Sequence, residues 1–205
     1  MRRELAPDIL VSAYAQGIFP MGMDDGDLGW FSPDPRAILP LDRFRVSKNL
    51  RRRYASGKFA VTVNRDFAAV IAACAERDEG TWISPEIIEA YTRLHELGFA
   101  HSVEAWLNDA LVGGLYGVTL GGAFFGESMF HRVTDASKVA LVFLVERMKQ
   151  RGFSLLDVQF LTEHLVRFGA QDIPREQYLR RLRLASSQTC RFAETLETRR
   201  LETRE

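Results

Sequence analysis

The pattern of apolar and polar residues changes near residue 59. Before that point only two short helices are expected, at residues 7–16 and after Ser47. Three prolines within residues 33–40 predict a rigid irregular segment that is neither a helix nor a central strand, because proline fixes φ and lacks a backbone donor. We therefore expect residues 1–58 to form a small irregular N-terminal domain that packs on the rest of the chain.

From residue 59 onward the pattern predicts regular elements in a fixed order. A strand is followed by two helices, three strands joined by short turns, a helix that Asp135 caps and Gly152 ends, another strand, and two more helices. Short turns predict antiparallel neighbours, whereas a helical crossover predicts a parallel pair. Residues 59–185 are therefore expected to form an α+β domain with a mixed sheet, the element order of the acetyltransferase-like (GNAT) fold. The polar residues 186–205 are expected to form a frayed or disordered tail.

Three polar residues occupy positions where two parallel strands should be apolar. Side chains two apart on a strand share a face, so Asp157 and Gln159 should point the same way. Glu127 should likewise lie with Phe125 and Met129, and the three polar groups would then meet near one sheet surface. A carboxylate beside a carboxamide suits the positioning of an amine that attacks an already activated ester. The alternative is a structural hydrogen-bonding pair, with Glu127 in an ordinary salt bridge.

Charge adds a second candidate feature. The chain has 27 basic and 27 acidic residues, yet residues 36–58 contain eight Lys and Arg and a single acid, Asp42. Such a patch is typical of phosphate contacts, although a solvated surface is the alternative. Two distant cysteines, no recognisable signal peptide and no apolar run of membrane-spanning length indicate a cytoplasmic protein without membrane contact.

Several other chemistries find little support in the sequence. The four histidines lack metal-ligand spacing, and the sequence Gly-Glu-Ser-Met lacks the second glycine of a serine hydrolase elbow. The segment before the Asp135 helix, HRVTDAS, contains no glycine, whereas an acetyl-CoA-binding GNAT enzyme normally cradles the pyrophosphate with glycine backbone there. We therefore expect no metal and no cofactor.

Several blocks of the sequence resemble one family when taken together. They lie between residues 14 and 182, in family order, and resemble the signature blocks of the leucyl/phenylalanyl-tRNA–protein transferases. The blocks are AYAQGIFPM, WFSPDPRAILPLDRFRVSKNLRR, TWISPEIIEAYTRLHELGFAHSVEAW, LVGGLYGV, FFGESMFHRVTDASKVAL and LLDVQFLTEHLVRFGAQDIPREQYL.

The resemblance implies an activity and partners. Leu or Phe, with Met as a further candidate, would pass from aminoacyl-tRNA to proteins with an N-terminal Arg or Lys, which marks them as N-degron substrates for degradation. Recognition of one tRNA by one chain makes a monomer the expected state. The alternatives are an acetyl-CoA-dependent N-acetyltransferase, another tRNA-dependent aminoacyltransferase of related fold, and a non-catalytic tRNA-binding protein.

The resemblance also assigns roles to individual residues. Asp157 and Gln159 correspond to the family's catalytic pair, and Glu127 to the acid at the amine site. In this hypothesis the acceptor amine enters beside Glu127 and Asp157, and Gln159 accepts or relays its proton. The positions that correspond to the site of the terminal adenosine are Tyr14, Trp82 and Tyr91. Those of the apolar pocket for Leu or Phe are Phe124 and Met129, and those of the tRNA contact are Lys48, Arg51, Arg52 and Arg53.

The sequence departs from the family pattern in two places. Many members have Trp where this chain has Met21, and many have a longer segment before the first helix. One stacking contact to the terminal adenine is therefore expected to differ.

Overall fold

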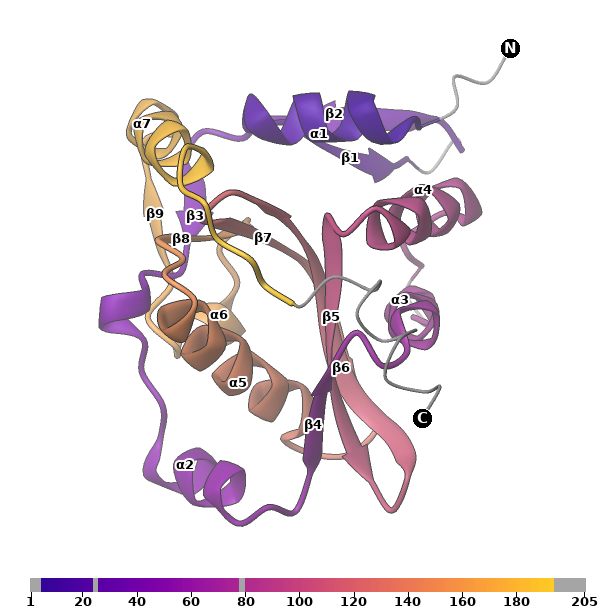
Figure 1. Ribbon diagram of the computed structural model, residues 1–205, viewed down its shortest axis with the longest axis vertical. Coiled ribbons are helices and arrows are strands. Elements are labelled where there is room, and N and C mark those ends of the chain that lie inside the picture. The colour runs from indigo at the N-terminus through magenta and orange to yellow at the C-terminus, as the bar shows by residue number, and fades with distance from the viewer. Residues whose placement is uncertain (1–4, 24–25, 78–79, 194–205) are drawn as a thin grey trace, which may run out of the picture.

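A mixed sheet of parallel and antiparallel strands lies at the centre of the molecule (Figure 1). The structure, a computed structural model, describes residues 5–23, 26–77 and 80–193. Within these residues seven strands form one sheet in the order β4-β5-β6-β7-β8-β3-β9, and β1 and β2 form a separate hairpin. The strands are β1 (Phe19–Gly22), β2 (Leu28–Phe31), β3 (Arg36–Ile38), β4 (Ala60–Val63), β5 (Ala100–Leu107), β6 (Ala110–Leu120), β7 (Ala123–His131), β8 (Leu155–Gln159) and β9 (Gln171–Ile173).

The predicted meander and crossover are both present. β5, β6 and β7 pair antiparallel, and β7 pairs parallel with β8 after a connection through the helix α5. Asn108 and Asp109 have φ of 50° and 59°, the left-handed backbone that a two-residue hairpin turn requires at both positions. The predicted α+β class, with its GNAT-like order of elements, is therefore confirmed.

Helices cover both faces of the sheet (Figure 1). One buried cluster joins residues of α1, α3, α4 and α7, and the other joins residues of α2 and α5. Leu155 and Leu156 are neighbours on β8 and belong to different clusters, as the alternation of a strand requires. The helices are α1 (Pro7–Ala15), η1 (Leu41–Arg43), α2 (Lys48–Ala55), α3 (Phe67–Ala75), α4 (Pro85–Glu96), α5 (Ala136–Gln150), α6 (Glu163–Val166) and α7 (Arg175–Ser186). In the described part of the chain, none of them is long and apolar enough to cross a membrane.

Side-chain caps begin α2 and α4 but not α5. The Ser47 hydroxyl accepts from the Leu50 backbone N–H (3.2 Å), and Ser84 caps α4 in the same way, ahead of Pro85. Asp135 also precedes its helix, but it has a φ of 71° and its side chain caps no backbone N–H. Its carboxylate instead accepts from Lys138 Nζ (3.0 Å), so the predicted cap at Asp135 is wrong.

The proline-rich segment contains a central strand, contrary to expectation. β3 lies between β8 and β9 and pairs antiparallel with both. Its three residues fall between Pro35 and Pro40, so each keeps the backbone N–H that a ladder needs. Residues 1–58 therefore contribute a strand to the same sheet as the rest of the chain, and a domain boundary at residue 58 stays a prediction.

The beginning of the expected tail is ordered against the domain. Phe192 is 2 % exposed, and its ring lies 5.1 Å from that of Phe124 and 6.0 Å from that of Phe153. Arg147 Nε donates to the Phe192 carbonyl oxygen (2.7 Å). The prediction of a frayed segment is thus wrong for residues 186–193, and its remainder, residues 194–205, lies outside the described residues.

Candidate active site

A β-bulge places Glu127 at the site. Tyr116 pairs with Ser128 and the next residue, Gly117, pairs with Gly126, so Glu127 is an extra residue in β7. The extra residue reverses the alternation, and Phe125 and Met129 therefore pack into different clusters. The expectation that these three side chains share one face is wrong for this reason.

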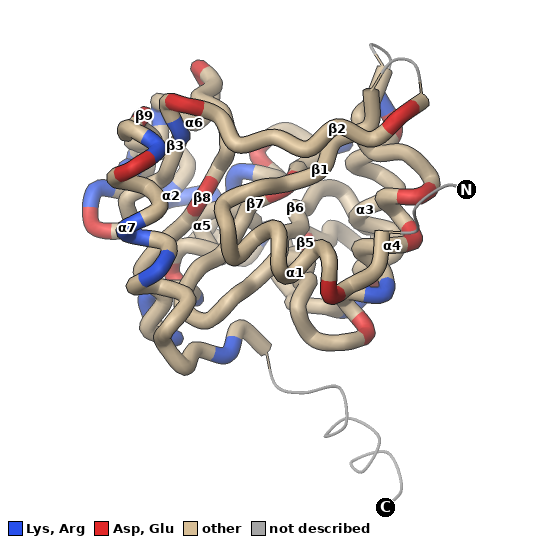
Figure 2. Tube along the Cα trace, turned by 90° about the horizontal axis from the view of Figure 1, so that it is seen from above, with Lys and Arg blue, Asp and Glu red and all other residues tan. Residues whose placement is uncertain are grey.

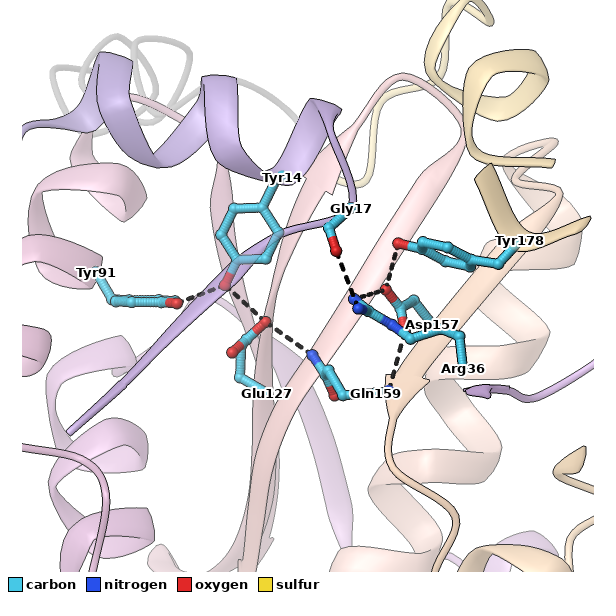
Figure 3. A network of polar contacts seen from close by, with 8 residues as sticks. All are labelled: Tyr14, Gly17, Arg36, Tyr91, Glu127, Asp157, Gln159 and Tyr178. Carbon is cyan, nitrogen blue, oxygen red and sulfur yellow. Dashed lines mark hydrogen bonds and ion pairs between the residues drawn. The ribbon is translucent and has the colours of Figure 1, made fainter. Parts of the chain in front are cut away.

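Asp157 is held in a buried clamp (Figure 3). Its two carboxylate oxygens accept from Arg36 Nε (2.9 Å) and Nη2 (2.7 Å), and the Tyr178 hydroxyl donates to Oδ2 (2.7 Å). Arg36 also donates to the Gly17 carbonyl oxygen (3.0 Å), and its guanidinium lies 4.6 Å from the centre of the Tyr178 ring. Arg36 and Asp157 are 1 % and 0 % exposed, so the pair is screened from solvent.

Gln159 ends β8 in a left-handed conformation. Its φ is 57°, and its backbone N–H donates to Asp157 Oδ1 (2.9 Å). Its side-chain Nε2 donates to Glu127 Oε1 (3.1 Å). The strand rule predicted parallel side chains for Asp157 and Gln159, but the left-handed backbone directs Gln159 toward Glu127 while Asp157 points into the clamp (Figure 3).

Glu127 also accepts a hydrogen bond from one of two buried tyrosines that are bonded to each other. Tyr14 donates to Glu127 Oε1 (2.8 Å) and is hydrogen-bonded to Tyr91. Burial raises the pKa of Glu127 to about 8, although the hydrogen bond from Tyr14 opposes that rise. The same burial raises the pKa of both tyrosines, so they stay neutral hydrogen-bonding groups.

A cavity of about 560 Å³ opens in front of Glu127 and Gln159. Trp82 and Met129 line it, and their roles toward adenosine and the Leu or Phe side chain stay predictions. Its apolar wall comes from β6, β7, β8, α5 and α6, and it includes Leu115, Met129, Leu141, Leu144, Leu156, Val158 and Leu165. Other lining residues come from β1 and the segments around α3 and α4, and they include Phe19, Met21, Arg77 and Trp82.

Four predicted site residues lie behind the cavity wall. Phe124 is fully buried against Phe192, and Asp157 is enclosed in its clamp. Tyr14 and Tyr91 are 1 % and 0 % exposed, so neither ring offers a face on which an adenine can stack. In this structure the two tyrosines support Glu127 instead.

The predicted basic helix is α2, and it lies beside α5. Lys48, Arg51, Arg52 and Arg53 are exposed on it, and Figure 2 shows basic segments at α2 and α7. Arg53 Nε lies 3.9 Å from Asp135 Oδ2, and Asp135 lines the cavity. The basic helix is therefore next to one rim of the cavity.

Two residues of the site received no role from the sequence. Arg36 and Tyr178 are separated from Asp157 by 121 and 21 residues, and only the fold brings them together. The one signal for Arg36 was a charged residue at the head of the apolar run that forms β3. Among the described residues, no cluster of three or more His, Cys, Asp or Glu side chains is arranged to hold a metal ion.

Known proteins resemble the chain over most of its length. Residues 38–183 match the family model of leucyl/phenylalanyl-tRNA protein transferase, and residues 3–34 match that of its N-terminal domain. The leucyl/phenylalanyl-tRNA–protein transferase of Salinibacter ruber is 58% identical over 183 residues, which cover 89% of this chain and 80% of the relative. That of Gloeobacter violaceus is 53% identical over 189 residues, or 92% and 97% of the two chains.

One solved structure that the chain matches is L-PGS from Bacillus licheniformis, with a TM-score of 0.44 and 15% identity over 63% of this chain and 48% of that one. Another is a ribosomal-protein-alanine N-acetyltransferase from Brucella melitensis, with a TM-score of 0.37 and 20% identity over 52% and 86% of the two chains.

The family models and the curated relatives establish the relationship: the chain belongs to the leucyl/phenylalanyl-tRNA–protein transferase family.

Proposed function

We propose that the protein transfers Leu or Phe from aminoacyl-tRNA to the N-terminal amine of proteins that begin with Arg or Lys. Membership of the family makes it an aminoacyltransferase. The observation that carries the proposal is the cavity, in which Glu127 and Gln159 lie beside a long apolar wall. An acid and an amide suit an incoming amine, and an apolar wall suits the side chain of Leu or Phe.

The aminoacyl end of the tRNA occupies the cavity in this proposal. The side chain of Leu or Phe packs against Met129 and the leucines of α5, and the terminal adenine stacks on Trp82. Burying such a side chain is worth about 1.5–3 kcal/mol, which is enough to select apolar amino acids over polar ones. Met21 also lines the cavity, and because it has no aromatic ring it provides a weaker contact to that adenine.

The acceptor protein enters beside Glu127. Its N-terminal ammonium and its Arg or Lys side chain are both cationic, so they favour a site that contains a carboxylate. The ester of aminoacyl-tRNA already stores the free energy of the new amide bond, so positioning and charge stabilisation supply the acceleration. Asp157 acts here as a positioning residue, because it holds the backbone of Gln159 without reaching the cavity.

An acyl-CoA donor fits this site less well than an aminoacyl-tRNA. The carboxylate of Asp135 stands at the start of α5 and lines the cavity, in the region where a GNAT enzyme binds the pyrophosphate of its donor. Lys138 and Arg53 already pair with that carboxylate, and the segment HRVTDAS ahead of α5 contains no glycine backbone to cradle a pyrophosphate. We propose accordingly that the protein works without a cofactor, as a cytoplasmic monomer, and that its products are N-degron substrates for degradation.

Incubation with labelled Leu-tRNA and a peptide that begins with Arg tests the function. We expect the label to join the peptide without CoA, and ribonuclease treatment of the tRNA before mixing to abolish the reaction. A matched peptide that begins with Gly should stay unlabelled, because it lacks the cationic side chain. Labelling from acetyl-CoA in place of Leu-tRNA would refute the proposal.

A further inference from the structure

The Asp157 carboxylate has no acceptor position left for a substrate. A carboxylate has about four lone-pair positions, and Asp157 accepts from Arg36 Nε and Nη2, from the Tyr178 hydroxyl and from the Gln159 backbone N–H. It is 0 % exposed and does not line the cavity. A group in this position cannot take a proton directly from an amine in the cavity.

Glu127 has the access that Asp157 lacks. It lines the cavity, and Tyr14 and Gln159 both donate to its Oε1 (2.8 Å and 3.1 Å). Two donors on one oxygen fix the carboxylate and stabilise its charged form. We propose that Glu127 is the general base that takes the proton from the acceptor's α-ammonium, an inference that rests on the proposed function.

The proton and bond changes balance without another reactant. Glu127 takes one proton from the ammonium, which leaves a neutral amine with a free electron pair. That pair forms the new C–N bond at the ester carbonyl carbon, and the C–O bond to the terminal ribose breaks. A second proton passes from the nitrogen to the ribose oxygen, and the third stays on the new amide. Glu127 releases its proton to solvent after the products leave.

The surroundings of Glu127 raise its pKa to a value that suits a base for an α-ammonium group. Burial raises its pKa to about 8, close to the pKa of about 7.7–8.0 of a free α-amino group. Proton transfer between groups of matched pKa is nearly balanced, which favours general base catalysis near neutral pH. Asp157 raises this pKa further and Arg36 lowers it, so the clamp also tunes the base. The titratable groups that interact with Glu127 are Tyr14 on α1, Arg36 on β3, Tyr91 on α4, Tyr116 on β6, Asp157 on β8 and Tyr178 on α7.

Gln159 acts as a positioning residue in this scheme. Its Nε2 donates to Glu127, so its remaining polar atom is an amide oxygen, which hardly binds protons. That oxygen can accept a hydrogen bond from the incoming amine and aim it at the ester. The bond from its backbone N–H to Asp157 keeps the side chain in place.

Glu127→Gln tests the proposal, because glutamine keeps the size of the side chain and an oxygen for both donors. Single-turnover rates are measured between pH 6 and 9.5 with labelled Leu-tRNA and saturating Arg-initiated peptide. We expect the wild-type rate to rise with pH, with a midpoint near pH 8, and to level off above about pH 9. The variant should be about a hundredfold slower at pH 7, and the deficit should shrink below about tenfold at pH 9.5, because the amine then arrives without its extra proton.

Tyr14→Phe provides a second test that leaves the base in place. Loss of one donor to the carboxylate should raise the pKa of Glu127, so the midpoint of the pH profile should move upward by about one pH unit. A merely structural effect would lower the rate equally at every pH. Unchanged thermal unfolding of both variants would show that they fold.

The outcomes separate this inference from the proposed function. If the wild-type protein transfers Leu but Glu127→Gln loses the same factor at every pH, or loses only peptide affinity, Glu127 binds the cation and is not the base. If the wild-type protein transfers nothing from Leu-tRNA at any pH, the proposed function fails first. A shrinking deficit together with an upward shift in Tyr14→Phe supports the proposal.

Discussion

Arg36 should contribute strongly to the stability of the fold. Its partner Asp157 is fully buried, so Arg36→Met leaves an uncompensated charge in the interior. Breaking a buried ion pair from one side typically costs about 3–5 kcal/mol. We expect urea denaturation at pH 7 to show a decrease of this size in the free energy of unfolding.

The exposed pair of Arg180 and Glu176 offers a matched control for that prediction. These side chains are 56% and 85% exposed, so solvent screens their attraction. Arg180→Met should change the free energy of unfolding by less than about 0.5 kcal/mol. Equal losses in the two variants would mean that burial of the clamp does not determine its contribution.

The sequence predicted which polar residues meet, but not how their side chains are oriented. The periodicity of the two parallel strands brought Glu127, Asp157 and Gln159 to one region, and the structure confirms their proximity. Their orientations depend on a bulge and on one left-handed residue, which binary patterning does not encode. Arg36 helps to fill the acceptor positions of the Asp157 carboxylate. The two residues are 121 positions apart in the sequence, so no local pattern predicts their contact.

At the scale of elements, length decided which parts of the fold could be predicted. Strands β5, β6 and β7 have eight to eleven residues and a clear alternation, and the sequence located all three. β3 and β9 have three residues each, too few to display a period, and both were missed. Proline argued against β3, although the prolines flank the strand and do not interrupt its ladder.

The segment after α7 should stabilise the domain through Phe192. Its ring fills a site between Phe124, Phe153 and His101, and Phe192→Ala would leave a cavity there. Such truncations cost about 3–5 kcal/mol, which corresponds to a decrease in Tm of about 10 °C for a chain of this size. Calorimetry measures the change, and Leu184→Ala is the control because Leu184 is 71% exposed.

A decrease in Tm of less than about 2 °C for Phe192→Ala would contradict this role for the segment. The result would also decide how far the ordered core extends. Phe192 lies beyond residue 183, where the match to the family model ends. A large effect would show that residues outside the matched region belong to the same cooperative unit.

At the scale of the whole molecule, tRNA binding should depend more on where the charges lie than on the net charge. The chain has no net charge, yet α2 carries a basic surface next to the cavity rim through the contact between Arg53 and Asp135. In the proposed function the aminoacyl end of the tRNA occupies the cavity. Its phosphates then extend outward from the rim that α2 borders. Phosphate contacts release counterions, so they weaken as salt increases.

Replacing Arg51, Arg52 and Arg53 together with Gln should therefore weaken tRNA binding most at low salt. Loss of three phosphate contacts should reduce the slope of log K against log salt by about 2–3, while the rate at saturating tRNA stays the same. The matched control replaces Arg180, Arg181 and Arg183 of α7, which removes the same charge from another helix. If both variants lose the same slope, tRNA responds to the overall charge of the protein. If only the α2 variant does, the basic helix forms the electrostatic contact, because the two variants differ in position and not in net charge.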